Sequence, residues 1–186
     1  MSKLPRLVIL DRDGVINEDS DDFVKSEDEW IPIPGSLESI TRLNHAGIPV
    51  AIATNQSGIG RGLFTLHDLN RMHAKFQREL ARFGGHIDGI FFCPHTPEAR
   101  CTCRKPAPGL LRSISQRFGL PLAGIPVIGD SKRDADAALA AGANPLLVRS
   151  GKGARTLADH PELHSLPCFE DLAGAVDYLL EGNHQR

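Results

Sequence analysis

The stretch that decides the fold lies near the start of the chain, where residues 7–17 read Leu-Val-Ile-Leu-Asp-Arg-Asp-Gly-Val-Ile-Asn. The apolar run at residues 7–10 predicts a short buried strand. Asp11 and Asp13 follow it directly, so two carboxylates can face one crevice at the strand end. A carboxylate that attacks phosphorus needs a hard cation nearby, and a second acid can protonate the leaving group and activate water. The pair points to metal-assisted phosphoryl chemistry, although Asp-x-Asp-Gly alone is also a common polar turn.

Strand-like and helix-like segments alternate along the rest of the chain. Further strands are predicted at residues 49–53, 87–92, 125–128 and 145–148. Helices are predicted at residues 36–46, 65–83, 108–118, 133–141 and 169–180. This alternation indicates an α/β fold with a doubly wound parallel sheet, in which ligands bind at the carboxyl ends of the strands. We expect residues 1–186 to form a single domain.

Polar loops follow two more of these strands. Residues 54–62 read Thr-Asn-Gln-Ser-Gly-Ile-Gly-Arg-Gly and combine hydroxyl and amide groups with glycines whose N–H groups can approach an anion closely. Residues 129–134 read Gly-Asp-Ser-Lys-Arg-Asp, which makes Asp130 a candidate metal ligand with Asp134 in support. Judged alone, the first segment is as typical of a flexible polar loop as of a phosphate site, and the second is more typical of a helix cap formed by Asp130 or Ser131. Together with the first loop they favour a phosphate site.

Three of the four cysteines lie within eleven residues, with a histidine among them. In a reducing compartment this spacing points to metal binding more than to disulfides. The candidate ligands are Cys93, His95, Cys101 and Cys103. Four such ligands fit a closed tetrahedral zinc site in a loop at residues 93–103, and a closed site would be structural. The loop leads into Arg104 and Lys105, and Lys105 could neutralise a transferring phosphoryl group.

Charge and hydropathy argue against several kinds of partner. The chain has 21 Lys and Arg against 23 Asp and Glu, so its net charge of −2 gives no general attraction to nucleic acid or anionic lipid. The apolar run at residues 7–10 is too short for a signal peptide or a membrane span. We therefore expect a cytoplasmic protein that binds neither nucleic acid nor membranes. We also expect a monomer.

Taken in order, DRDGVIN, TNQSGIGRG, CRKPAPG and GDSKRDAD resemble the four motifs of the haloacid dehalogenase (HAD) superfamily of aspartate-nucleophile phosphatases. The resemblance implies a capless HAD Rossmann-like fold, because no long insertion follows the first or second motif. It also implies roles for individual residues. Asp11 would be the nucleophile and Asp13 the general acid/base, while Thr54 and Lys105 would hold the phosphoryl oxygens. Magnesium would bind Asp11, the Asp13 carbonyl and Asp130.

A zinc loop between the second and third motifs is similar to that of two phosphatase families, which act on D-glycero-D-manno-heptose 1,7-bisphosphate and on histidinol phosphate. The segments TNQSGIGRG and CRKPAPG resemble the heptose family more closely. That resemblance implies removal of the C7 phosphate to give heptose 1-phosphate, in ADP-heptose and lipopolysaccharide core synthesis. The gap of seven residues between His95 and Cys103 also resembles histidinol phosphatases, so that alternative stays open.

The heptose resemblance implies further substrate contacts. Arg104 would bind the second phosphate, and carboxylates of an acidic loop could accept hydrogen bonds from sugar hydroxyls. The expected substrate-binding residues are Asp19, Ser20, Asp21, Asp22, Asn55, Gln56, Ser57 and Arg104. A receiver-like signalling domain is the alternative from another class. Receiver domains carry their phosphoacceptor after the third strand, whereas the acidic pair here follows the first.

Overall fold

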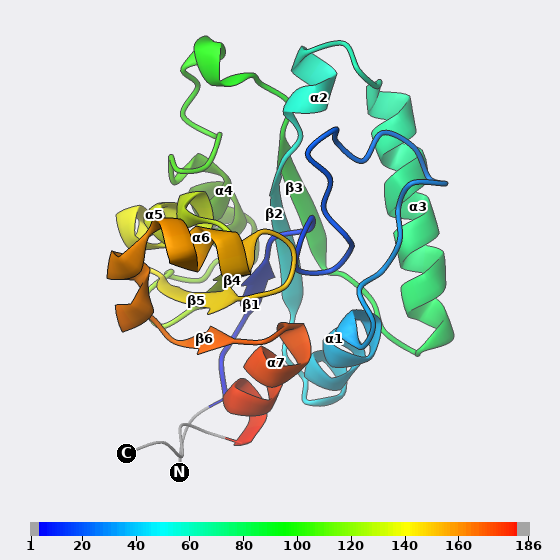
Figure 1. Ribbon diagram of the computed structural model, residues 1–186. Helices are drawn as coiled ribbons and strands as arrows, with labels where there is room; N and C mark the ends of the chain where they lie inside the picture. Colours follow the sequence, from blue (N-terminus) through cyan, green and yellow to red (C-terminus); the bar gives the residue numbers. More distant parts are fainter. Residues whose placement is uncertain (1–3, 182–186) are drawn as a thin grey trace.

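A six-stranded sheet, parallel throughout, forms the centre of the computed structural model, which describes residues 4–181 (Figure 1). The strands are β1 (Val8–Leu10), β2 (Val50–Asn55), β3 (Gly89–Cys93), β4 (Pro126–Gly129), β5 (Asn144–Val148) and β6 (Cys168–Phe169). Their order is β3-β2-β1-β4-β5-β6. The chain therefore moves outward in one direction after β1 and in the other after β4. The order reverses between β1 and β4, which is where doubly wound sheets bind ligands.

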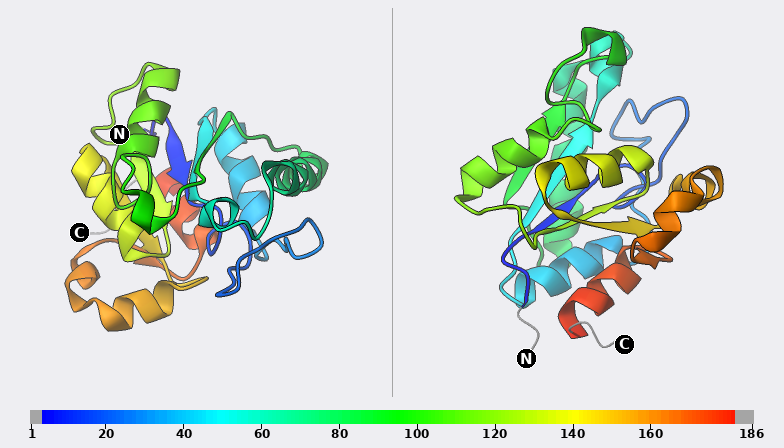
Figure 2. Two further views of the ribbon diagram at one scale, coloured as in Figure 1. Left: turned by 90° about the horizontal axis from the view of Figure 1, so that it is seen from above. Right: turned by 90° about the vertical axis from the view of Figure 1, so that its left-hand side faces the viewer.

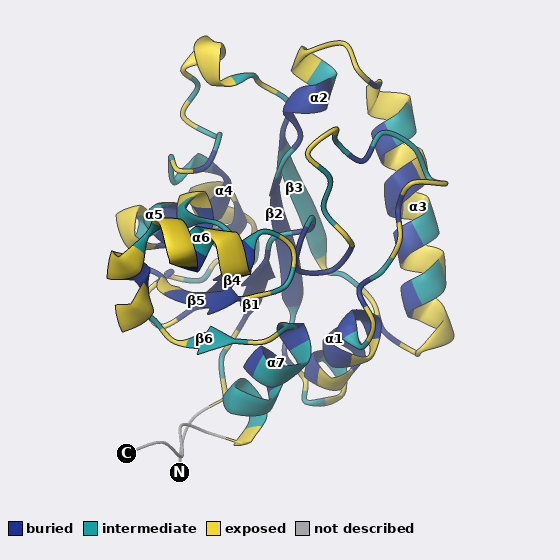
Figure 3. Ribbon diagram, viewed as in Figure 1, coloured by how far each residue is buried: buried dark blue, intermediate teal, exposed yellow. Residues whose placement is uncertain are grey.

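Helices cover both faces of this sheet (Figure 2). They are α1 (Ser36–His45), α2 (Ser57–Gly60), α3 (Leu66–Arg82), α4 (Gly109–Phe118), α5 (Lys132–Ala141), α6 (Gly153–Asp159) and α7 (Leu172–Glu181), with short 3-10 turns at Pro97–Ala99 and Pro161–Ser165. Helices α1, α3 and α7 share one core with Val8 and Leu10, whereas α4 and α5 share the opposite core with Leu7 and Ile9. Alternate residues of β1 thus serve the two faces, which explains its fully apolar sequence. The central strands are accordingly buried (Figure 3).

Local signals set several helix ends. Helix α3 begins with a capping box, in which the Thr65 side chain accepts a hydrogen bond from the Asp68 N–H and the Asp68 carboxylate accepts one from the Thr65 N–H. Helices α4 and α5 end at Gly119 and Gly142, whose φ angles of 64° and 74° lie in the left-handed region that favours glycine. None of the helices in residues 4–181 is long and apolar enough to cross a membrane.

The predicted α/β fold is confirmed, with differences at a few short elements. The helix predicted at residues 169–180 begins instead at Leu172, because Cys168 and Phe169 pair with β5 and form the edge strand β6. Helices α2 and α6 were not predicted, since their Gly-containing polar segments are typical of loops. The other predicted strands and helices lie within about two residues of the observed bounds.

The long segment between β1 and α1 is held down by Trp30. Its side chain is fully buried and lies 5.4 Å from Phe76 of α3 between ring centroids. The Lys75 ammonium donates to the backbone oxygens of Glu27 and Trp30, so α3 also holds the segment by its main chain. This segment includes the acidic loop at residues 19–22. The packing of Trp30 therefore helps to position that loop at the carboxyl end of the sheet.

Replacing Trp30 tests this packing. We expect Trp30→Ala to lower the free energy of unfolding by about 3–5 kcal/mol, because it removes a large buried side chain. The neighbouring Ile31 is 56% exposed, so Ile31→Ala is a matched control expected to change stability by less than about 0.5 kcal/mol. Urea denaturation measures both. Equal effects of the two changes would contradict the proposed anchoring by Trp30.

Candidate active site

Three carboxylates meet where the strand order reverses. Asp11 directly follows β1, Asp130 directly follows β4, and Asp134 lies in the first turn of α5. The Asp11 N–H donates to the Ile128 carbonyl at 2.9 Å, so the β1 and β4 pairing sets how close the two strand ends lie. One oxygen atom from each carboxylate lies within 4.8 Å of the others. The site predicted for divalent metal therefore has its acidic groups together.

Glycines make room for this cluster. Gly14 has a φ of +83° and Gly151 a φ of +59°, and a Cβ on either residue would overlap the Asp130 carboxylate. The carboxylate also accepts a hydrogen bond from the Lys152 N–H at 2.7 Å. The loops after β1 and β5 thus hold the Asp130 carboxylate between them.

Like charges and burial raise the pKa values in the cluster. Burial, Asp134 and Asp13 raise the pKa of Asp11 to about 7, although Lys105 partly opposes the shift. Burial, Asp11 and Asp134 raise the pKa of Asp130 to about 8, against the hydrogen bond from Lys152. The positive charge around these carboxylates is too small to offset their burial and their mutual repulsion. Their oxygen atoms fit a hard divalent cation such as Mg²⁺, which would supply that charge.

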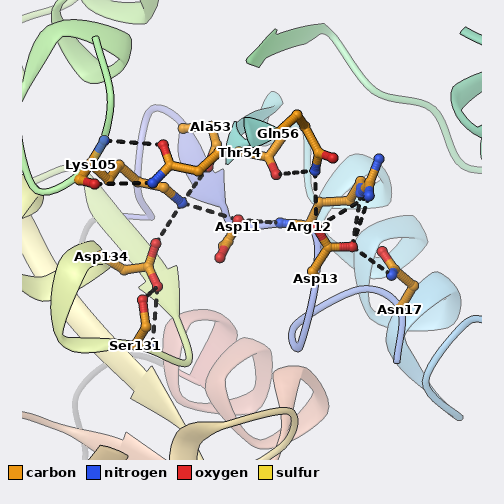
Figure 4. A network of polar contacts seen from close by, with 11 residues as sticks. Asp11, Arg12, Asp13, Asn17, Ala53, Thr54, Gln56, Lys105, Ser131 and Asp134 are labelled. Atoms are coloured by element: carbon orange, nitrogen blue, oxygen red, sulfur yellow. Dashed lines mark hydrogen bonds and ion pairs between the residues drawn. The ribbon is translucent and has the colours of Figure 1, made fainter. Parts of the chain in front are cut away.

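Lys105 is the cation that the protein itself places in the cluster (Figure 4). Its Nζ lies 3.0 Å from Asp11 and 2.5 Å from Asp134, and donates to the Ala53 carbonyl at 2.7 Å. Burial alone would lower its pKa, but the two carboxylates raise it overall, so Lys105 stays charged. The Asn55 amide nitrogen donates to the Lys105 carbonyl at 3.0 Å, and its amide oxygen accepts from the Lys105 N–H at 3.1 Å. Asn55 thus ties the end of β2 to the loop that carries Lys105.

Asp13 has a separate set of partners. Its carboxylate accepts hydrogen bonds from Arg12, from Asn17 at 2.9 Å and from Gln56 at 2.9 Å. Burial would raise the pKa of Asp13, but the Arg12 charge and these hydrogen bonds lower it overall. Asp13 is therefore ionised in the free protein, and its side chain keeps 20% exposure toward the cavity. Gln56 also donates to the Thr54 hydroxyl at 2.8 Å, so its amide connects Asp13 of the first motif with Thr54 of the second.

A cavity of about 310 Å³ opens above these groups. Sequence reasoning singled out two of its cations, Arg104 and Lys105, and missed three others: Arg61, Arg133 and Lys152. The first two of the missed residues lie inside quoted motifs, and Lys152 follows the fifth predicted strand. All three residues lie in segments that follow predicted strands, so the binding of ligands at strand ends could have identified them.

The acidic loop is only partly at the cavity. Asp19, Ser20 and Asp21 line it, whereas Asp22 is exposed and not among the lining residues within 4–181. Asp19 and Asp21 form ion pairs with Lys152 at 2.9 and 3.1 Å. The loop after β1 is thus bridged to the loop after β5. Asn55, Gln56 and Ser57 line the same cavity, while Thr54 is 1% exposed and is not among its lining residues.

The predicted zinc ligands converge at one point. The Cys103 sulfur lies 3.2 Å from that of Cys93 and 3.4 Å from that of Cys101, and His95 Nδ1 lies 3.3 Å from Cys103. All three thiols are free, so the cluster is not a disulfide. Tetrahedral zinc with Zn–S bonds of about 2.3 Å would separate the sulfurs by about 3.8 Å. The cluster therefore has nearly the size of a tetrahedral site and could hold a metal ion.

Comparison with known proteins agrees with this geometry. Residues 102–175 match the family model of HAD-hydrolase-like proteins. The D-glycero-β-D-manno-heptose-1,7-bisphosphate 7-phosphatase of Bordetella bronchiseptica is 52% identical and covers 95% of this chain and 98% of its own. The enzyme of the same name from Pseudomonas aeruginosa is 51% identical and covers 94% and 98%.

A solved structure agrees as well. The crystal structure of D,D-heptose 1,7-bisphosphate phosphatase from B. bronchiseptica, complexed with magnesium and phosphate, superposes with a TM-score of 0.92. It is 52% identical and covers 95% of this chain and 98% of its own. The similarity therefore extends over nearly the full length of both chains. The chain belongs to the family of D-glycero-β-D-manno-heptose-1,7-bisphosphate 7-phosphatases, which are HAD-type phosphatases.

Proposed function

We propose that this phosphatase removes the C7 phosphate of D-glycero-β-D-manno-heptose 1,7-bisphosphate through an aspartyl-phosphate on Asp11. The observation that carries the mechanism is the position of the Asp11 carboxylate, 3.0 Å from a buried lysine and beside Asp130 at the open end of the sheet. A nucleophilic carboxylate there meets the phosphoryl group beside positive charge. The named relatives support the substrate and its β anomer.

The first step forms one bond and breaks another. An Asp11 oxygen attacks phosphorus in line, the bond between phosphorus and the C7 oxygen breaks, and the leaving oxygen takes a proton from Asp13. Asp13 is ionised in the free protein, and the negative charge of an arriving phosphate raises its pKa so that it can carry this proton. Lys105 and the Thr54 hydroxyl are proposed to hold the phosphoryl oxygens.

In the second step, water attacks the phosphorus of the aspartyl-phosphate and Asp13 accepts the proton of that water. The hydrogen bonds that lower the pKa of Asp13 favour the carboxylate form that accepts this proton. Phosphate and a free Asp11 carboxylate result. The residues proposed to hold Mg²⁺ are Asp11, Asp130 and the Asp13 carbonyl, with Asp134 in support. Magnesium would offset the repulsion between the nucleophile and the phosphate.

The remaining groups are proposed to recognise the sugar and its second phosphate. Arg104 donates to the His95 carbonyl at 3.4 Å, so the metal-binding loop supports a cation at the rim of the cavity. We propose that this loop holds structural Zn²⁺ and that Arg104 binds the C1 phosphate. Asp19, which is paired with Lys152, and Ser20 both line the cavity and would contact sugar hydroxyls. We also propose a cytoplasmic monomer that supplies ADP-heptose synthesis.

Phosphate release by the purified protein with Mg²⁺ tests the assignment. We expect kcat/KM for the heptose bisphosphate to exceed that for histidinol phosphate by about 10²-fold or more, because several buried polar groups must be matched by the substrate. Asp11→Asn should release no phosphate from either ester, since the nucleophile is lost. A preference for histidinol phosphate would reject the substrate, and normal turnover by Asp11→Asn would reject the mechanism.

Magnesium binding should depend on pH in a defined direction. The pKa values of about 7 and 8 for Asp11 and Asp130 exceed the unfolded value of 3.8, so the folded protein retains protons that the unfolded chain loses. This contribution to stability is present at low pH and is lost as pH rises through 7 and 8. Because Mg²⁺ binds the ionised carboxylates, we expect it to raise the Tm more at pH 8 than at pH 6.

Thermal unfolding in buffers dialysed free of magnesium measures this, and chelators are avoided because they would also remove zinc. Asp130→Asn is the control and should lose most of the magnesium-dependent Tm shift. A magnesium shift that is equal at both pH values, or larger at pH 6, would contradict the proposed ligands.

The Cys/His loop at residues 93–103 can be tested with a matched pair of cysteines, one inside the loop and one outside it. We expect Cys101→Ser to lower zinc content and Tm together, because a thiolate ligand is removed from a site that orders the loop. Cys168 lies in β6, so Cys168→Ser should retain about one zinc per chain. Mass spectrometric metal analysis and calorimetry provide the readouts. Full zinc content in Cys101→Ser would rule out the proposed ligand set.

A further inference from the structure

His73 contacts Arg12 beside the active site, although it lies on none of the four motif loops. It lies on α3, is 8% exposed, and places Nε2 3.3 Å from a terminal nitrogen of Arg12. Arg12 is fully buried and lies between the proposed nucleophile and Asp13 in the sequence. The mechanism above uses neither side chain.

Arg12 has a divided set of partners. Its second terminal nitrogen donates to the two Asp13 oxygens at 2.8 and 3.2 Å, and its Nε donates to Asp13 at 3.1 Å. The first terminal nitrogen faces His73. A buried guanidinium is costly unless its N–H groups are bonded. Asp13 therefore satisfies one edge of the fork and His73 part of the other.

The chemistry of the contact sets the state of the histidine. A guanidinium can only donate hydrogen bonds, so His73 Nε2 must be the acceptor and the ring proton lies on Nδ1. Burial and the Arg12 charge lower the pKa of His73 to about 4, although Asp13 opposes the shift. The ring is therefore neutral at neutral pH, as an acceptor must be.

We propose that His73 is a positioning residue, which by accepting a hydrogen bond from Arg12 fixes the guanidinium that orients the Asp13 carboxylate. The inference rests on the proposed role of Asp13 as proton donor and acceptor. Asn17 and Gln56 each donate one further hydrogen bond to Asp13. Arg12 is thus the partner with the most bonds to this carboxylate, and His73 limits how its planar group can turn. A misplacement of about 1 Å at such a group can cost about 10²-fold in rate.

The test compares side chains that differ in where they place an acceptor. In His73→Gln the amide oxygen can occupy the place of Nε2, whereas in His73→Asn the shorter side chain cannot reach Arg12. We expect His73→Asn and His73→Leu to lower kcat by about 10²-fold with little change in KM, because Asp13 acts in the chemical steps. His73→Gln should recover most of the kcat. As a control, Gln77→Leu changes an exposed residue one helical turn further along α3 that does not line the active-site cavity, and it should leave kcat unchanged.

The Tm of every variant is measured beside its kinetics. If His73→Leu does not fold, the pair Gln and Asn still decides, because both are polar and differ in reach. Equal kcat for the Gln and Asn variants, full kcat in His73→Leu, or a loss confined to KM would each overturn the proposal. Using p-nitrophenyl phosphate as a second substrate separates the two inferences. If the sugar assignment is wrong, the wild type hydrolyses p-nitrophenyl phosphate but not the heptose bisphosphate. The kcat values of the His73 variants can then still be compared on p-nitrophenyl phosphate.

Discussion

The buried Lys105 ammonium, bonded to Asp11 and Asp134, is the interaction on which the active site depends. A buried ammonium is costly unless it is fully paired, and here two carboxylates and one carbonyl surround it. The same carboxylates repel one another. Lys105 neutralises part of their negative charge, and a bound divalent cation would neutralise the rest. Stability and phosphoryl chemistry thus draw on one cluster.

The sheet topology explains how that cluster assembles. Asp11 and Asp130 are distant in the sequence but lie at the ends of neighbouring parallel strands, at the reversal of strand order. Asn55, at the end of β2, ties in the loop of Lys105 through two hydrogen bonds. Three strand ends and one loop therefore fix the proposed reacting groups, and the loop at residues 93–103, whose Cys/His cluster could hold a metal ion, leads directly to Lys105.

Most of the fold could be predicted from the sequence, because five strands are short apolar runs bounded by turn residues. Strand β6 could not be predicted, because two residues at a sheet edge show no periodicity. Strand-end loops also pointed to the carboxylates that the structure brings together. The contact between Arg12 and His73 was out of reach, because it joins a motif residue to a helix 61 positions away by side-chain geometry alone. The partners of Asp19 and Asp21 on the loop after β5 were equally invisible to local patterns.

The stereochemical course at phosphorus distinguishes phosphoryl transfer through Asp11 from direct attack by water. An isotope-labelled chiral phosphorothioate ester, hydrolysed by the protein in labelled water, reports whether the phosphorus centre inverts once or twice. Transfer to Asp11 followed by transfer to water comprises two in-line displacements, so we expect net retention of configuration. Net inversion would mean that water attacks the substrate directly, and would contradict an aspartyl-phosphate on Asp11.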